Sequence, residues 1–142
     1  MIETRREVLS ELRDVLKAVR VFKQRIPVVA VPAGTLGVLA AIAAGRGSHV
    51  TELATECALD PSTVSRAVAA LDRAGFVGRE ADPNDGRACV LTLTDPGRAA
   101  IDHVLTDYER GMSEALADWT PDELRTFSTL LHRFTHDLLE AA

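Results

Sequence analysis

Cysteine is scarce in this sequence: Cys57 and Cys89 are the only two among 142 residues. They form no C-x-x-C pair, so the patterns of a disulfide scaffold and of a zinc site are both missing. Long hydrophobic runs are missing too. The longest apolar stretch, residues 36–44, is about half of the ~20 residues that a transmembrane helix needs, and charge begins at Glu3 without a signal-peptide pattern. We therefore expect a protein of the reducing cytoplasm.

Signatures of catalysis are also lacking. The sequence shows no nucleophile with a neighbouring base, no glycine-rich phosphate loop and no pair of catalytic carboxylates. His132 and His136 lie one helical turn apart and could share a metal ion, but they have no evident third ligand, so exposed or interface histidines are the favoured interpretation. The sequence argues against an enzyme and predicts neither a cofactor nor a metal site.

Charge is distributed unevenly along the chain. Sixteen Lys and Arg stand against 21 Asp and Glu, which gives a net charge of −5. Residues 1–32 carry +3, residues 33–93 carry −2 and residues 94–142 carry −6. Since this balance excludes a general basic coat, any DNA contact must come from locally placed cations. The length fits one domain over residues 1–142.

The N-terminal segment predicts a long helix. Apolar residues recur at alternating spacings of four and three over residues 8–26, which predicts a helix over residues 3–25 that ends before Pro27. A helix of this length extends ~35 Å, more than a small core needs, so part of it should meet another chain. Residues 26–31 should form an apolar connection.

The C-terminal segment predicts two further helices. The first should start near Asp95. The second should start at Thr120, which forms a capping box with Glu123. We interpret residues 1–31 and 95–142 as dimerisation helices and residues 32–94 as a separate lobe.

That central lobe begins with three short helices. Pro32 should open a helix that runs to residue 44, and residues 45–48 should form a loop. Thr51 should cap a short helix that contains Leu53, Ala54 and Cys57. Asp60 and Pro61 should open the third helix, which ends at Gly75 and buries Val64, Val68 and Leu71.

Two strands are predicted after these helices, over residues 76–80 and 88–93. The segment between them is dense in turn residues, so the strands should form a β-hairpin with a charged tip. Cys89, Leu91 and Leu93 should share its core-facing side. A helix-turn-helix followed by a hairpin is a winged helix. The predicted fold class is therefore mainly α with a small β-hairpin, a winged helix-turn-helix flanked by dimerisation helices.

A winged helix places its second helix in the major groove of DNA and its hairpin tip beside the minor groove. The side chains that we expect to contact DNA from the helix are Ser62, Thr63, Ser65 and Arg66, and those from its end and from the wing are Arg73, Arg79, Asn84, Asp85 and Arg87. Asp85 would repel DNA if unpaired, so we expect it to hold Arg87 or Arg79 through a salt bridge. Arg73 and Arg79 could equally pair with Asp72, Glu80 or Asp85 on the surface. A polar helix face exposed only to water is the competing interpretation.

Several motifs in this region resemble the MarR family of bacterial transcription regulators. They are Leu53-Ala54, Pro61-Ser62-Thr63-Val64-Ser65-Arg66, Leu71-Asp72-Arg73-Ala74-Gly75-Phe76-Val77-Gly78-Arg79, the wing motif Asp85-Gly86-Arg87 and Leu93-Thr94-Asp95-Pro96-Gly97. The resemblance implies a homodimer formed by the terminal helices, a pseudo-palindromic operator in double-stranded DNA, and a small, often phenolic effector that weakens DNA binding. Ala58 departs from the family pattern, because glycine is frequent at that position in the turn.

Three alternatives remain beside a DNA-binding repressor. The acidic balance also fits a winged-helix module that binds proteins instead of DNA. Cys57 and Cys89 could sense redox state, although their apolar patterns favour inert packing in the core, and the two C-terminal histidines could make the regulator respond to a metal. An aromatic effector would need a pocket, and its candidate borders are Phe22, Tyr108, Met112 and Trp119, which core and dimer packing explain equally well.

Overall fold

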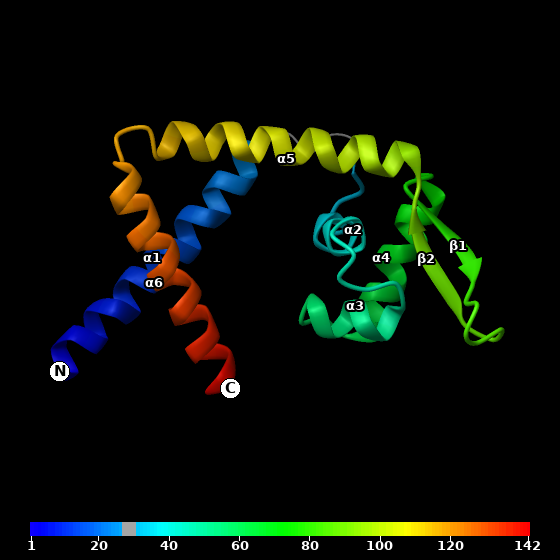
Figure 1. The fold of residues 1–142 in the computed structure, drawn as a ribbon, viewed down its shortest axis with the longest axis horizontal. Helices are drawn as coiled ribbons and strands as arrows, with labels where there is room; N and C mark the ends of the chain where they lie inside the picture. The colour runs from blue at the N-terminus through cyan, green and yellow to red at the C-terminus, as the bar shows by residue number, and fades with distance from the viewer. Residues whose placement is uncertain (27–30) are drawn as a thin grey trace. The chain divides into compact units, whose positions relative to one another are not determined.

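The computed structural model describes residues 1–26 and 31–142, which form six helices and one two-stranded antiparallel sheet (Figure 1). In chain order the elements are α1 (Ile2–Arg25), α2 (Leu36–Ala43), α3 (Val50–Glu56), α4 (Pro61–Arg73), β1 (Val77–Ala81), β2 (Cys89–Leu93), α5 (Asp95–Ala115) and α6 (Pro121–Glu140). Residues 1–108 make up one structural unit and residues 109–142 a second. Within the described residues, no helix is both long and apolar enough to cross a bilayer. The predicted fold class is confirmed.

α1 is the long N-terminal helix that the apolar spacing predicts, and it buries none of its side chains. Val8, Val15 and Val19 of the predicted seam are 47%, 50% and 43% exposed. Near its end, the ring of Phe22 lies 5.7 Å from that of Tyr108. Pro27 and most of the predicted connection lie outside the described residues. The seam leaves a long apolar surface uncovered within one chain.

α2 begins at Leu36, so the prediction that Pro32 opens this helix is wrong. The residues before it form a turn instead. Gly34 adopts a left-handed conformation with φ of +76°, and Thr35 donates to the carbonyl oxygen of Pro32 through both its N–H (3.2 Å) and its hydroxyl (2.7 Å). A left-handed residue interrupts the helical hydrogen bonds, so a helix can start only after it.

The core of the first unit lies between α2, α3, α4, the hairpin and the first half of α5. Its buried apolar side chains include Val38, Leu39, Leu53, Val64, Val68, Leu71, Val77, Leu91, Ile101 and Val104. The predicted stripe of α4 is confirmed, because Val64, Val68 and Leu71 are at most 1% exposed. Burial of this stripe fixes which side of α4 faces outward.

The two cysteines differ in their surroundings. Cys57 packs partly against the core, and its burial raises the pKa of its thiol. Cys89 is exposed, so the prediction that it packs in the core is wrong. It pairs with Ala81 at the end of the ladder farthest from Val77 and Leu93, where the hairpin extends past the helices. Period-two spacing identifies a face of a strand but does not say how far the core covers it.

α3 starts one residue after His49, which is its N-cap, so the predicted cap at Thr51 is wrong. Thr51 instead lies inside the first turn. The carboxylate of Glu52 accepts a hydrogen bond from the N–H of Ser48 at 2.9 Å, which satisfies a backbone donor ahead of the helix. A carboxylate three residues into the helix therefore fixes where α3 begins.

α3 ends in a Schellman motif with an unusual residue. The N–H of Leu59 donates to the carbonyl of Ala54 (2.9 Å) and that of Ala58 to Thr55 (3.2 Å). Ala58 has φ of +51°, and it is the single non-glycine residue with positive φ among those described. The equivalent positions after α2 and α4 are Gly45 and Gly75. The departure from glycine noted in the sequence therefore falls on a left-handed residue.

β1 and β2 pair from Val77 opposite Leu93 to Ala81 opposite Cys89, close to the predicted strand limits. The hairpin is also attached to the segment before α3, since the N–H of Leu91 donates to the carbonyl of Ser48 at 2.8 Å. Figure 1 shows the hairpin beside α4. The wing is thus anchored to both halves of the helix-turn-helix.

The L-T-x-x-G motif joins the start of α5 to the end of α4. The hydroxyl of Thr94 donates to the carbonyl of Gly75 at 2.6 Å and accepts from the N–H of Gly97 at 3.1 Å, while the N–H of Thr94 donates to Phe76 at 3.1 Å. A Cβ at Gly97 would lie 2.0 Å from the carbonyl oxygen of Phe76. Only glycine permits this close approach. We call these residues the α4–α5 latch.

α5 and α6 begin where the sequence predicts. Thr120 caps α6 in the predicted capping box with Glu123, whose pKa is lowered by hydrogen bonds from the N–H and hydroxyl of Thr120. In the second unit, the ring of Trp119 lies 5.4 Å from that of Phe127. α6 buries none of its side chains, and apolar residues along it are about half exposed, among them Phe127, Leu130, Leu131 and Leu138.

Candidate nucleic-acid interface

The outward face of α4 carries the four helix residues that the sequence predicts to contact DNA. Ser62, Ser65 and Arg66 are exposed and Thr63 is half-buried. Asp60 is the N-cap and Pro61 the first helical residue, as predicted, although the Asp60 side chain makes no cap hydrogen bond. The helix therefore presents two serines and an arginine in its first two turns, beside a helix N-terminus that favours a phosphate.

Arg66 is partly ordered within this face. Its guanidinium donates to the hydroxyl of Thr63 at 3.3 Å, one turn earlier on the helix. This bond uses one of the five N–H donors of the guanidinium, so the others remain available to a base edge or a phosphate. The hydrogen bond aims the arginine along the helix surface and not away into solvent.

The wing tip carries Asn84, Asp85 and Arg87, all exposed. Two aspartate side chains shape its turns: Asp82 accepts from the N–H of Asn84 at 2.8 Å, and Asp85 accepts from the N–H of Arg87 at 3.1 Å. Hydrogen bonds from side chain to backbone two residues on are typical of Asx turns. The tip therefore has a defined backbone, from which the Arg87 side chain extends.

The predicted salt bridge of Asp85 with Arg87 or Arg79 is not observed among the described residues. Asp85 holds the backbone of Arg87 and not its guanidinium. Arg79 instead pairs with Asp72 of α4, with 3.4 Å between Nε and Oδ2. The D-x-R spacing places the carboxylate two residues before the arginine, where the nearest donor is the backbone N–H.

Arg73 lies exposed in the last turn of α4, so the predicted set falls into two groups. Ser62, Thr63, Ser65 and Arg66 share one helix face, and Asn84, Asp85 and Arg87 share the wing tip. Arg73 and Arg79 lie between these two groups along the chain. The ion pair with Asp72 partly neutralises the positive charge of Arg79.

Two residues that sequence reasoning missed are His49 and Asp82. The Nδ1 atom of His49 lies 3.1 Å from Glu52, and its Nε2 atom lies 2.9 Å from Asp82. Hydrogen bonds to Glu52 and Asp82 raise the pKa of His49. The pKa of Glu52 is lowered chiefly by the N–H of Ser48, and that of Asp82 chiefly by the N–H of Asn84. The one available signal was the spacing of His49 and Glu52, which is that of a capping box.

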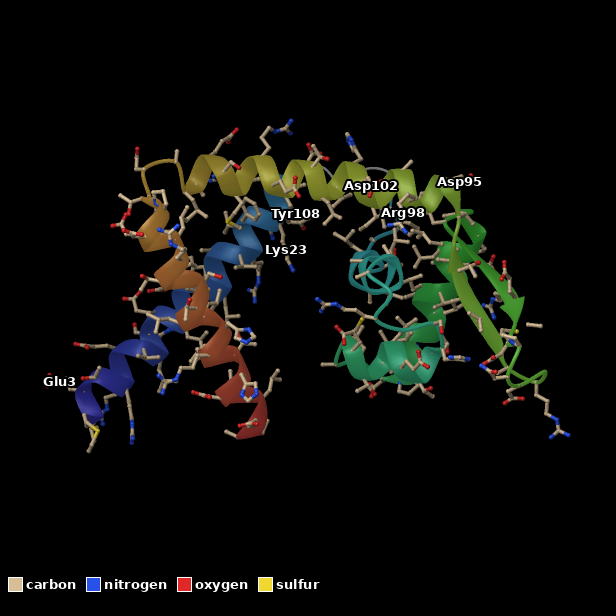
Figure 2. All side chains as sticks on the ribbon, in the orientation of Figure 1. Glu3, Lys23, Asp95, Arg98, Asp102 and Tyr108 are labelled. Atoms are coloured by element: carbon tan, nitrogen blue, oxygen red, sulfur yellow. The ribbon has the colours of Figure 1, made fainter. Side chains whose placement is uncertain are left out.

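A cavity of about 710 Å³ lies within the first unit, between the end of α1, the start of α2 and α5. Tyr108 lines it together with Lys23 (Figure 2), and its apolar walls include Ile26, Val31, Leu36, Ile101, Val104 and Leu105. Of the predicted border residues, Tyr108 lines the cavity and Phe22 packs against Tyr108. Met112 and Trp119 belong to the second unit. The volume suits a drug-sized molecule.

Comparison with known proteins agrees with this geometry. A model of the MarR family matches residues 31–88. The chain is 31% identical over 93 residues to YxaD, an uncharacterised HTH-type transcriptional regulator of Bacillus subtilis (strain 168), across 66% of this chain and 65% of that protein. Matches to four regulators of that organism cover between 47% and 65% of their lengths, thus less than two thirds.

Solved structures extend the likeness over nearly the whole chain. The crystal structure of MarR superposes with a TM-score of 0.75 at 28% identity and covers 93% of this chain and 90% of that one. The PcaV transcriptional regulator of Streptomyces coelicolor, solved with its natural ligand, gives 0.69 at 26% identity over 88% and 89%. In its winged helix and over most of its length, this chain is similar to the MarR family of transcription regulators.

Proposed function

We propose that this protein is a cytoplasmic transcription regulator that binds a pseudo-palindromic DNA operator as a homodimer and represses until a small effector releases it. The observation that carries this proposal is the outward face of α4, where Ser62, Ser65 and Arg66 are exposed directly after a helix N-terminus. Small hydroxyl side chains let a helix approach base edges closely, and an arginine reads guanine.

The uncovered terminal helices support a homodimer. Neither α1 nor α6 buries a side chain within the chain, yet both carry apolar residues that are about half exposed. Exposed apolar faces of this length mark interfaces. We assign residues 1–31 and 95–142 to dimerisation and residues 32–94 to DNA binding, and a second copy as the partner.

The effector is assigned to the cavity between α1, α2 and α5. Apolar walls with Tyr108 and the ammonium of Lys23 at the border suit a small aromatic molecule that carries a negative charge. PcaV, which is similar over most of its length, was solved with its natural ligand, which supports a ligand-responsive regulator.

The DNA-binding test starts without a known operator. Duplexes selected by the purified protein from a random 30-base-pair pool should converge on an inverted repeat whose half-sites lie about 10 base pairs apart. Affinity for that duplex should fall steeply with salt, because phosphate contacts release counterions. A pool that yields no enriched duplex at low salt would contradict DNA binding and favour a protein-binding module.

Arg66→Ala then tests the reading face. Loss of a good base contact costs about 1–3 kcal/mol, which is roughly 5- to 150-fold in affinity. Arg98→Ala is the matched control, because Arg98 is an exposed arginine of α5 outside the candidate interface (Figure 2). Equal affinities of the two variants, measured by fluorescence anisotropy, would remove Arg66 from the interface.

A further inference from the structure

His49 connects α3 to the wing through both of its ring nitrogens. Nδ1 lies 3.1 Å from Oε1 of Glu52, and Nε2 lies 2.9 Å from Oδ2 of Asp82, which is 33 positions away in the sequence. The side chain of His49 is 29% exposed and that of Asp82 is 13% exposed. The imidazole is therefore enclosed between two carboxylates, one from the helix-turn-helix and one from the wing.

Asp82 divides its two carboxylate oxygens between the histidine and the wing turn. Oδ2 faces His49, while Oδ1 accepts from the N–H of Asn84 at 2.8 Å. The backbone N–H of Asp82 also donates to the carbonyl of Ala88 across the wing, at 3.0 Å. A movement of Asp82 would therefore disturb hydrogen bonds to both Asn84 and Ala88 of the wing segment, residues 82–88.

Both contacts of His49 can be hydrogen bonds only when the ring is protonated. A carboxylate can only accept, and a neutral imidazole has one N–H donor, whereas the imidazolium has two. Loss of the proton leaves a nitrogen lone pair facing a carboxylate oxygen at hydrogen-bond distance. One of the two contacts must then open.

We propose that His49 is a positioning residue for the wing: as imidazolium it holds residues 82–88 against α3 through its charge and two hydrogen bonds, and on losing its proton it holds them more weakly, so that affinity for DNA falls as pH rises. The predicted change in DNA affinity rests on the proposed function. The contacts of His49 with Glu52 and Asp82, which we call the tether, do not rest on it, because they can be observed on the free protein.

The surrounding charges favour the protonated form of His49. α3 faces the ring with Glu52, the wing with Asp82, and the preceding loop with the Ser48 hydroxyl, 3.4 Å from Nδ1. Arg46 of that loop is held by Glu56 at 2.9 Å. The two carboxylates raise the pKa of His49 above 6.5, so the tether has its full strength below pH 6.5 and weakens as pH rises through the raised pKa.

The tether is measured first, by NMR on the free protein between pH 5.5 and 9. The His49 ring and the backbone amides of Asn84 and Ala88 should titrate with one shared midpoint above 6.5. In His49→Gln the amide titration should disappear. In His103→Gln, which removes an exposed histidine of α5, it should persist.

Asp82→Asn provides a second variant that keeps the turn. Its side-chain oxygen can still accept from the N–H of Asn84, but the charge that faces Nε2 is gone. The midpoint of His49 should fall, and the wing amides should no longer follow it. A residue with only a packing role would leave the midpoint where it was.

Affinity for the selected duplex is measured next, at constant ionic strength. It should fall about threefold to tenfold from pH 6 to pH 8.5, the range that loss of one hydrogen bond of about 1 kcal/mol allows. The fall should be strongly reduced in His49→Gln and unchanged in His103→Gln.

Two results would overturn the inference: wing amides that stay unchanged while His49 titrates, or a pH dependence of affinity that His49→Gln keeps in full. A titrating wing in a protein that binds no duplex at any pH would instead uphold the tether and overturn the proposed function.

Discussion

Replacing Ala58 with glycine should stabilise this protein. Ala58 follows the C-cap of α3 with φ of +51°. In that region the Cβ of an L-residue costs about 1–2 kcal/mol compared with glycine. The greater freedom of glycine in the unfolded chain offsets about 0.4–1 kcal/mol of this. Since Ala58 is exposed, its methyl group contributes no packing that would be lost. The free energy of unfolding should therefore rise by about 0.5–1 kcal/mol, the difference of those two terms.

The chain contains its own controls for this estimate. Gly45 and Gly75 occupy the same position after α2 and α4, with φ of +69° and +79°. A Cβ added at either would meet no atom within 4 Å, so an alanine there adds a backbone cost without a clash. Gly45→Ala and Gly75→Ala should each lower the free energy of unfolding by about the amount that Ala58→Gly raises it.

Urea denaturation followed by far-ultraviolet circular dichroism would measure all three variants. Protein concentration must be held constant, because the proposed dimerisation would contribute to apparent stability. For Ala58→Gly we expect a higher urea midpoint with an unchanged slope, and a rise of about 1–4 °C in Tm. If Gly75→Ala loses stability while Ala58→Gly gains none, the left-handed backbone at position 58 carries no cost and the reasoning fails.

Three further substitutions test other parts of the structure. Gly97→Ala forces a Cβ to within 2.0 Å of a backbone oxygen and should lower the free energy of unfolding in urea by about 3 kcal/mol or more. Gly37→Ala, where a Cβ meets no atom within 4 Å, should be neutral or stabilising. Similar losses in both variants would refute the close approach at Gly97. Thr120→Ala removes the N-cap of α6 and should lower the free energy of unfolding by about 1 kcal/mol, and an unchanged Tm would contradict that role. Leu131→Asp should convert the proposed dimer to a monomer in light scattering after size-exclusion chromatography, because Leu131 is 48% exposed within one chain, while Ser128→Asp on the same helix should not. A dimer that survives Leu131→Asp would exclude this face from the interface.

The elements predicted correctly from sequence are those with local signals. α4 and α6 each begin at a capping residue followed by proline, and their apolar residues repeat at helical spacing. The outward face of α4 follows directly, because its buried stripe leaves Ser62, Ser65 and Arg66 on the other side. Periodicity and capping act over three or four residues, so a sequence displays them in full.

The errors fall where contacts distant in sequence decide the outcome. Exposure of Cys89 depends on how far the helices extend beneath the hairpin. The choice of Asp72 and not Asp85 as the partner of Arg79 depends on how α4 and the hairpin come together. The spacing of His49 and Glu52 does not indicate the second partner of the ring, since Asp82 reaches it only after the hairpin folds back. The start of α2 was missed because the spacing of residues does not show that Gly34 takes a left-handed backbone.

The α4–α5 latch at Thr94 and Gly97 couples the position of α5 to that of α4. Two hydrogen bonds from Thr94, to Gly75 and Phe76, and the close approach of Gly97 to Phe76 join the two segments, so a tilt of α5 would displace the end of α4. The wall of the 710 Å³ cavity is built partly from Ile101, Val104 and Tyr108 of that same helix. A molecule bound there would tilt α5 and thereby shift α4, without unfolding any part of the chain.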